Sequence, residues 1–244
     1  MEFFASCPTG FEDALADELN ALSLAQVRKL KGRVSFTGQV IDGERACLWS
    51  RLASRILVVI DRFDARDADA LYAGTREIAW EEILAEGVTI AVTARGTNDN
   101  LRNARFSALR VKDAICDRLL EATGARPNVD TENPGARIAL SIRNDRASLH
   151  LDLSGDALFR RLPREATHGD AAHHVLRPDY AALALAQGGW SALCAETPGE
   201  GEDAESAGPL VFVDACCAGG GLVLEAPQQL LDRAPGLLRE RWGF

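Results

Sequence analysis

The stretch PLVFVDACCAGGGLVLEA, residues 209–226, decides which fold the later part of the chain adopts. An apolar run ends at Asp214, a glycine-rich turn follows, and a second apolar run begins after Gly221. This order predicts a strand, a tight turn and a helix. Glycine lets the backbone approach a ligand closely, and the amide groups at a helix N-terminus attract nucleotide-like ligands. We therefore expect a nucleotide-type site at this turn of an open α/β sheet.

The spacing of the glycines separates two classes of nucleotide site. A dehydrogenase-type site needs G-x-G-x-x-G, and counted from Gly219 the third glycine is replaced by Leu224. A nucleotide-dependent oxidoreductase that binds NADH is therefore disfavoured. An acid followed by small residues and glycines instead resembles motif I of class I S-adenosylmethionine-dependent methyltransferases. A glycine turn with only a folding role is the other interpretation.

Length and composition predict an ordinary cytoplasmic protein without a membrane segment. The 244 residues are 47% hydrophobic, which is enough for one large or two small domains. No apolar run reaches the roughly 18 residues that a membrane span requires. The N-terminus has no basic region of the kind that begins a secretory signal peptide, so a secretory signal is disfavoured. Six scattered cysteines form no CxxC pair, so we expect reduced thiols and neither disulfides nor a zinc site. We expect structural or solvated roles for the histidines, which are His150, His168, His173 and His174.

The net charge of -9 argues against a nucleic-acid partner bound by bulk electrostatics alone. Phosphate binding draws on clustered Lys and Arg, so local clusters could still bind RNA. The acids concentrate near the start of the chain and in residues 196–205, which leaves the middle of the chain less acidic than the total charge suggests.

Hydrophobic periodicity predicts an α+β fold. Residues 55–155 show the order strand, helix, strand, helix, strand, strand, rather than regular βαβ units. Residues 195–208 have the composition of an exposed loop. The expected strands are 2–7, 33–37, 56–60, 89–94, 136–143 and 147–153, the last two joined by a turn at 144–145, and the expected helices are 11–22, 44–54, 71–78, 80–84, 101–119 and 178–190.

Eight collinear segments resemble one family, the THUMP-domain large-subunit (23S) ribosomal RNA guanine-N2 methyltransferases. They include GTNDNLRNARFSALRVKDAICD at 96–117 and LDLSGDALFRR at 151–161. The others are residues 4–19, 48–56 and 126–130, the Ala-rich helix that ends at Trp190, the glycine turn, and residues 232–244.

The resemblance implies a domain organisation and a reaction. It implies an N-terminal ferredoxin-like region (1–54), a THUMP RNA-binding domain (55–155), a linker (156–175) and the incomplete start of an α/β Rossmann-like methyltransferase domain (176–244). Family members transfer a methyl group from S-adenosylmethionine to the exocyclic N2 of a guanine in large-subunit ribosomal RNA.

The family's catalytic Asn/Asp-Pro-Pro-aromatic motif is absent from residues 227–244. We therefore expect a truncated member that has no catalytic residue and is inactive alone. The alternative is a stand-alone, non-catalytic THUMP-type RNA-binding module.

The resemblance also assigns a cofactor turn. The family usually shows Asp-Pro-x-Cys-Gly-Ser-Gly, whereas this chain has Ala215 for the proline and Ala218 for the first glycine. Ala218 adds a Cβ where the turn needs positive φ, and Gly219 could take over that conformation. A thiolate nucleophile at Cys216 is disfavoured because Asp214 opposes the negative charge, and the same holds at Cys217. The expected cofactor-binding residues are Asp214, Ala215, Cys217, Ala218, Gly219 and Gly220.

The expected RNA-binding residues flank the helix at 101–119. Guanidinium groups can bind phosphates in a bidentate way, and folded RNA is recognised largely by shape and backbone contacts. Basic residues beside an apolar stripe can also be just the solvated face of a helix, but the resemblance to the THUMP pattern favours RNA. Arg160, Arg161 and Arg164 could extend the same track. The expected RNA-binding residues are Asn98, Arg102, Asn103, Arg105 and Lys112.

Overall fold

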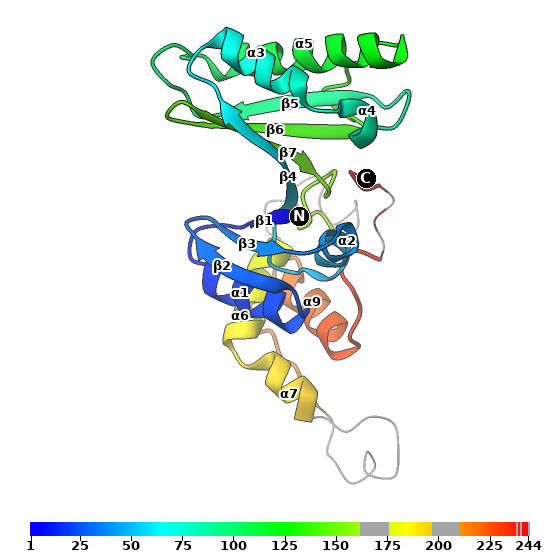
Figure 1. Ribbon diagram of the computed structural model, residues 1–244. Helices are drawn as coiled ribbons and strands as arrows, with labels where there is room; N and C mark the ends of the chain where they lie inside the picture. Colours follow the sequence, from blue (N-terminus) through cyan, green and yellow to red (C-terminus); the bar gives the residue numbers. More distant parts are fainter. Residues whose placement is uncertain (162–175, 197–209, 238, 240, 244) are drawn as a thin grey trace. The chain divides into compact units, whose positions relative to one another are not determined.

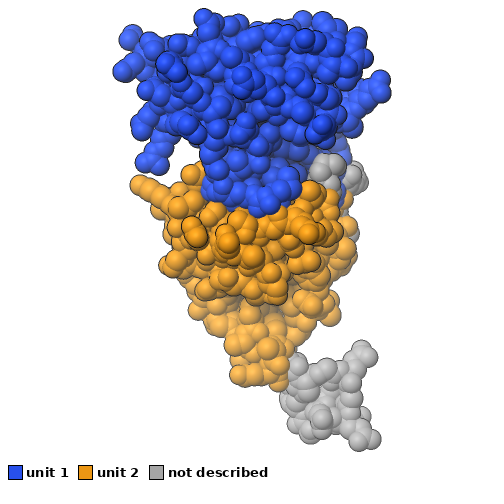
Figure 2. All heavy atoms as spheres, in the orientation of Figure 1, with its two compact units in different colours: residues 1–4, 57–156, 241–244 blue, residues 5–56, 157–240 orange. Residues whose placement is uncertain are grey.

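The computed structural model describes residues 1–161, 176–196, 210–237, 239 and 241–243. The chain divides into two compact units, which Figure 2 shows in different colours. Unit 1 comprises residues 1–4, 57–156 and 241–244, and unit 2 comprises residues 5–56 and 157–240. No helix within the described ranges has the length and apolar character that crossing a membrane requires.

Unit 1 is a mixed sheet with helices on one face. Its strands are β4 (Arg55–Asp64), β5 (Ile90–Arg95), β6 (Ala136–Arg143) and β7 (Arg146–Asp152), ordered β4-β7-β6-β5. The β5–β6 pair is parallel, and the other two pairs are antiparallel. Three helices complete the unit: α3 (Ala68–Glu77), α4 (Trp80–Ile83) and α5 (Ala104–Thr123). Figure 1 shows α3 and α5 lying across the same face of this sheet.

The sequence pattern explains which face of this sheet is covered. Buried Ile138, Leu140 and Ile142 alternate along β6 with partly exposed residues, as a half-buried strand requires. These three side chains pack in one cluster with Val111 and Ile115 of α5. The expected strands at 136–143 and 147–153, the turn between them and the α+β class are confirmed.

The capping residues of helix α5 determine where it begins and ends. The carboxamide oxygen of Asn103 accepts hydrogen bonds from the backbone N–H groups of Arg105 and Phe106, which makes Asn103 the N-cap. Gly124, at φ 75°, ends the helix in the left-handed conformation. Leu101, expected inside the helix, precedes it and is fully buried.

Unit 2 contains β2 (Ala25–Leu30) and β3 (Arg33–Thr37), and the hydrogen-bonded order β2-β3-β1 places β1 (Glu2–Ser6) next to β3. Both β1 and β4 have residues in the two units. Among the described residues, the helices of unit 2 are α1 (Glu12–Ala21), α2 (Val40–Trp49), α6 (Pro178–Gln187), α7 (Trp190–Glu196) and α9 (Gly221–Leu230).

Four of the expected elements are absent or have other bounds in the structure. The helix expected at 178–190 breaks at Gly188 and Gly189, where Gly189 adopts φ 78°. The strand expected before the glycine turn is absent from the described residues 210–213, since no described strand pairs with them. The strand expected at 56–60 is longer, and its residues are alternately buried. Helix α2 begins and ends several residues before the expected 44–54.

Candidate RNA contacts and cofactor turn

The loop that leads into α5 is tied to the strand ends of unit 1. Gly96 adopts φ +85°, and a Cβ built there would lie 2.0 Å from the carbonyl oxygen of Ile142, so only glycine fits. The side-chain amide of Asn98 donates hydrogen bonds to the carbonyl oxygens of Ala65 (2.9 Å) and Asn144 (3.2 Å). Its carboxamide oxygen accepts the backbone N–H of Leu101 at 2.7 Å. Asn98 therefore fixes the loop and has little capacity left for RNA.

Of the other four expected RNA contacts, two side chains are already bonded within the protein and two are exposed. Asn103 uses its oxygen to cap α5. The Lys112 ammonium forms an ion pair of 2.5 Å with Asp113 and is only 23% exposed. Arg102 is exposed, and its Nε donates to the carbonyl oxygen of Asp99 at 2.7 Å. Arg105 is also exposed. Within the set, these two arginines present the most accessible positive charge at the start of α5.

The expected extension of this track through Arg161 was wrong. Its side chain is 4% exposed and forms an ion pair of 3.2 Å with Glu225, and its guanidinium donates to the carbonyl oxygen of Arg51. Desolvation lowers the pKa of the Arg161 guanidinium below its usual value. A polar stretch of sequence thus supplies a buried cation. Arg160 is exposed, and Arg164, His168, His173 and His174 lie outside the described residues.

The glycine turn is exposed and closes by backbone hydrogen bonds. The N–H of Gly220 donates to the carbonyl oxygen of Cys217 at 2.7 Å, and Oδ1 of Asp214 accepts the N–H of Cys216 at 3.0 Å. Ala218 adopts φ 43° and Gly220 φ 79°. The expectation that Gly219 would take over the positive φ was wrong, because Ala218 adopts it and bears the strain of its Cβ.

The turn leads into α9 without bulky side chains. Gly220 is the N-cap of this ten-residue helix, and a Cβ on Gly221 would lie 2.7 Å from the carbonyl oxygen of Leu176. Between Ala218 and Gly221 no side chain exceeds a methyl group, so a ligand can reach the backbone amides. These features fit a nucleoside-type cofactor.

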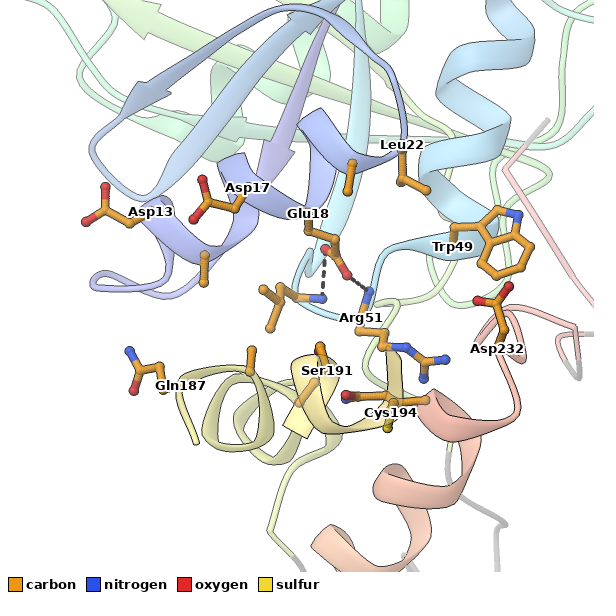
Figure 3. A pocket seen from close by; sticks show the side chains of 16 residues that line it. Asp13, Asp17, Glu18, Leu22, Trp49, Arg51, Gln187, Ser191, Cys194 and Asp232 are labelled. Carbon is orange, nitrogen blue, oxygen red and sulfur yellow. Dashed lines mark hydrogen bonds between the residues drawn. The ribbon is translucent and has the colours of Figure 1, made fainter. Parts of the chain in front are cut away.

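Unit 2 also has an open pocket that the sequence did not indicate. Its volume is about 930 Å³, and Asp13, Asp17, Glu18 and Asp232 contribute acids to its lining (Figure 3). Glu18 accepts the N–H of Arg51 at 2.6 Å, and burial raises the pKa of this carboxyl above its usual value. Because these acids outnumber the cations in the lining, the pocket is unsuited to phosphate.

The structure places the two candidate sites in different units. The residues around the start of α5 lie in unit 1, and the glycine turn lies in unit 2. His150 takes part in neither site: it is buried, and its Nδ1 lies 3.2 Å from the carbonyl oxygen of Ala139.

Comparison with known proteins agrees with the fold of both units. The RlmL ferredoxin-like domain model matches residues 2–57, and the THUMP domain model matches residues 65–152. The protein named ribosomal RNA large subunit methyltransferase K/L from Syntrophotalea carbinolica is 42% identical over the full chain. The protein of the same name from Aeromonas salmonicida is 41% identical. The chain spans 32% and 31% of these relatives, about a third of their length.

Solved structures of longer proteins share this fold. The SMU.472 protein, crystallised with SAH, superposes with a TM-score of 0.77 at 25% identity over 98% of this chain and 58% of its own. TrmN from Thermus thermophilus gives a TM-score of 0.60 at 27% identity over 81% of this chain and 55% of its own. The chain therefore contains an RlmL ferredoxin-like domain and a THUMP domain, and along its whole length it is similar to about a third of the length of the ribosomal RNA large subunit methyltransferases K/L.

Proposed function

We propose that this chain binds large-subunit ribosomal RNA through unit 1. The observation that carries the proposal is the THUMP match at residues 65–152, which includes the exposed Arg102 and Arg105 at the start of α5. The loop before the helix is fixed by Asn98, and the helix start is fixed by the Asn103 cap. A charged group on a rigid support loses less entropy on binding than one on a free loop.

The negative net charge of the chain means that RNA binding must depend on local positive charges. Because the net charge is -9, general electrostatic attraction opposes RNA rather than favouring it. Binding therefore depends on a few local guanidinium contacts, and its strength falls as salt rises. Arg102 and Arg105 are the contacts that we assign, whereas Lys112 is held by its ion pair with Asp113. Asn98 and Asn103 position the loop and the helix.

We further propose that this RNA-binding part serves a methyltransferase acting on the exocyclic N2 of a guanine. S-adenosylmethionine supplies the methyl group in that reaction. The residues that would hold the cofactor are Asp214, Ala215, Cys217 and the backbone of residues 218–220. The carboxylate of Asp214 precedes the turn, and the first backbone amide groups of α9 follow it. The sequence contains no Asn-Pro-Pro-aromatic motif that could orient the target amine, so we expect no methyl transfer from this chain alone.

The test combines a binding and a transfer experiment on this polypeptide. Filter binding with transcribed large-subunit ribosomal RNA measures affinity, and incubation of the same mixture with tritiated S-adenosylmethionine measures transfer. We expect salt-dependent RNA binding without incorporation of label. Absence of RNA binding would refute the proposed function. Label in the RNA would instead refute the expectation that the chain is inactive alone.

A further inference from the structure

The helices of unit 1 leave part of the opposite face of its sheet exposed, toward the β6–β7 turn, whereas His150 and Asp152 at the other end of this face are buried. Residues paired across neighbouring strands point to the same face, so the registers define its members. The face opposite the helix-covered core carries Thr93 and Arg95 of β5, with Ser141 as the direct partner of Arg95. In the β6–β7 pair, Ser141 is opposite Ser148, and Arg143 is opposite Arg146.

Three arginines dominate the end of this face. Arg95, Arg143 and Arg146 are all exposed, and we call them the arginine cluster. Within the described residues, none of their guanidinium groups forms a hydrogen bond or an ion pair within 4 Å, although the charge of Arg146 acts on Asp64. Two acids lie nearby. Asp64 is opposite Arg146 across the β4–β7 pair and accepts a hydrogen bond from Arg66, and Asp145 lies in the turn between β6 and β7.

The pairing of Arg143 with Arg146 is unfavourable in the free protein. Like charges directly opposite each other on antiparallel strands destabilise the pair. Arg95 adds a third positive charge on the neighbouring strand, diagonal to Arg143, because its direct partner Ser141 lies two residues before Arg143. Asp64 bonds to Arg66 and also interacts with the charge of Arg146, so the three positive charges share this end of the sheet with two acids, Asp64 and Asp145. An anion between them would relieve the repulsion and form charge-assisted hydrogen bonds.

The anion must also match the shape of the surface. On β5, β6 and β7 the neighbours of the arginine cluster on this face are the small residues Thr93, Ser141 and Ser148, which leave this part of the face polar and without bulky side chains. On β4 the neighbours are Asp64 and Arg62, and Arg62 pairs with Glu2. A row of guanidinium groups on neighbouring strands suits a chain of phosphates more than one small anion, because each planar fork can bind one phosphate.

The arginine cluster lies at the same end of unit 1 as the assigned RNA contacts. Asn98 bonds to the carbonyl oxygens of Ala65, just after β4, and Asn144, in the β6–β7 turn. The parallel strands β5 and β6 both end there, as Figure 1 shows. The loop that Asn98 anchors leads directly to Arg102 and Arg105.

We propose that the arginine cluster binds the phosphodiester backbone of RNA and extends the contact from the start of α5 onto the open face of the sheet. This proposal rests on the proposed RNA binding of unit 1. It names a surface that the sequence did not indicate, because its three members come from two separate parts of the chain.

The test is a double variant, R143Q/R146Q, with a matched control, R76Q/R126Q. Arg76 and Arg126 are exposed residues of the same unit, and Arg76 pairs with Glu121 near the far end of α5. Both double variants lose two positive charges. We expect R143Q/R146Q to weaken binding of large-subunit ribosomal RNA about ten-fold or more and to reduce the slope of log K against log salt by about 1.4. The control should change affinity less than about two-fold.

A second measurement separates binding from folding. The single variant R143Q removes the like-charge pair, so the thermal midpoint of the RNA-free protein should rise by about 1–4 °C while RNA binding weakens. If Arg143 had only a structural role, R143Q would lower both the thermal midpoint and the RNA affinity. Unchanged RNA affinity of R143Q/R146Q, or an equal loss in R76Q/R126Q, would overturn the proposal while the wild-type chain still binds RNA. Failure of the wild-type chain to bind RNA would instead overturn the proposed function.

Discussion

Arg51 and Glu225 lie 174 residues apart in the sequence and form an ion pair of 2.9 Å inside unit 2. Glu225 is 3% exposed, and Arg161 binds the same carboxylate from another direction. Arg51 also donates to the carbonyl oxygens of Gln228 and Arg233. The network joins the segment after α2 to helix α9, so the early and late parts of unit 2 stabilise each other through charge as well as apolar packing.

Replacing the shared carboxylate should destabilise unit 2 strongly. E225Q removes the carboxylate charge that the buried Arg161 and the mostly buried Arg51 share, and breaking a buried pair in this way costs about 3–5 kcal/mol. Urea unfolding followed by tryptophan fluorescence measures the change. The control is D13N, which breaks the exposed pair of Asp13 with Lys29 and should leave the unfolding midpoint unchanged. Equal midpoints for E225Q and wild type would show that the network contributes no stability.

Glu18 should make stability depend on pH. Burial raises the pKa of its carboxyl above the ordinary value of 4.5, so the folded state holds this proton more tightly than the unfolded state does. The stabilising contribution is complete below the unfolded pKa and is lost as pH rises through the folded pKa. E18Q should therefore show a smaller fall in unfolding free energy from about pH 4.5 to pH 7. Denaturant titrations at several pH values measure this, with the exposed Glu86 replaced in E86Q as control. Parallel pH profiles for E18Q and wild type would contradict the assignment.

Charge reversal at the start of α5 should weaken RNA binding without unfolding the protein. Arg102 and Arg105 are exposed and lie off the buried stripe of Val111, Ile115 and Leu119. R102E/R105E should lower affinity for large-subunit ribosomal RNA by about ten-fold or more and flatten its salt dependence. Filter binding at several salt concentrations, together with a thermal melt, tests this. Wild-type affinity in the variant would remove the helix start from the RNA surface.

Two positive-φ glycines of unit 1 should differ in their tolerance of a methyl group. Gly96 and Gly124 adopt φ +85° and +75°, but only Gly96 lacks room, since its Cβ would lie 2.0 Å from a backbone oxygen. G124A should cost about 1 kcal/mol of unfolding free energy from the left-handed conformation alone. G96A should cost at least about 2 kcal/mol more, because the loop must also move away from Ile142. Denaturation of both variants measures the difference, and similar losses would contradict the crowding at Gly96.

The cysteines should react with alkylating reagents in a fixed order. Burial and the nearby Glu12 raise the pKa of Cys7 to about 11, so little of its reactive thiolate form exists at about pH 8. Cys216 and Cys217 lie exposed in the glycine turn. Iodoacetamide labelling followed by mass spectrometry should therefore modify these two thiols well before Cys7. Labelling of Cys7 at a rate equal to theirs would contradict the described burial.

Local patterns predicted the parts of the fold whose causes are local. The alternation along β6 and the apolar stripe of α5 identified both elements because each buries one face against the same core. Strand β2 was missed, because it is an edge strand in which five of the six side chains are exposed, and it shows no alternation. The segment 210–213 has the composition of a strand but forms none. Its apolar composition predicts a strand, but a strand also needs a neighbour with which to pair.

The candidate sites were less predictable because they depend on contacts between residues that are far apart in the sequence. Arg161 stands in a polar stretch that predicts exposure, and its burial depends on Glu225, 64 residues away. Asn98 carries the residue type of a phosphate contact, but its bonds reach Ala65 and Asn144, which only the folded sheet brings close. Arg143 and Arg146 stood in the predicted hairpin, yet their relation to Arg95 depends on the parallel pairing of β5 with β6.

Unit 1 is assembled from three separate parts of the chain, and this has a consequence for its synthesis on the ribosome. The N–H of Gly243 donates to the carbonyl oxygen of Leu153 at 3.1 Å, and Gly243 packs so closely that a Cβ there would lie 2.0 Å from the Asp152 oxygen. A nascent chain that has just released residue 156 still lacks this last segment. The contacts of Gly243 with Leu153 and Asp152 therefore form only after residues 157–240, which belong to unit 2, have been synthesised.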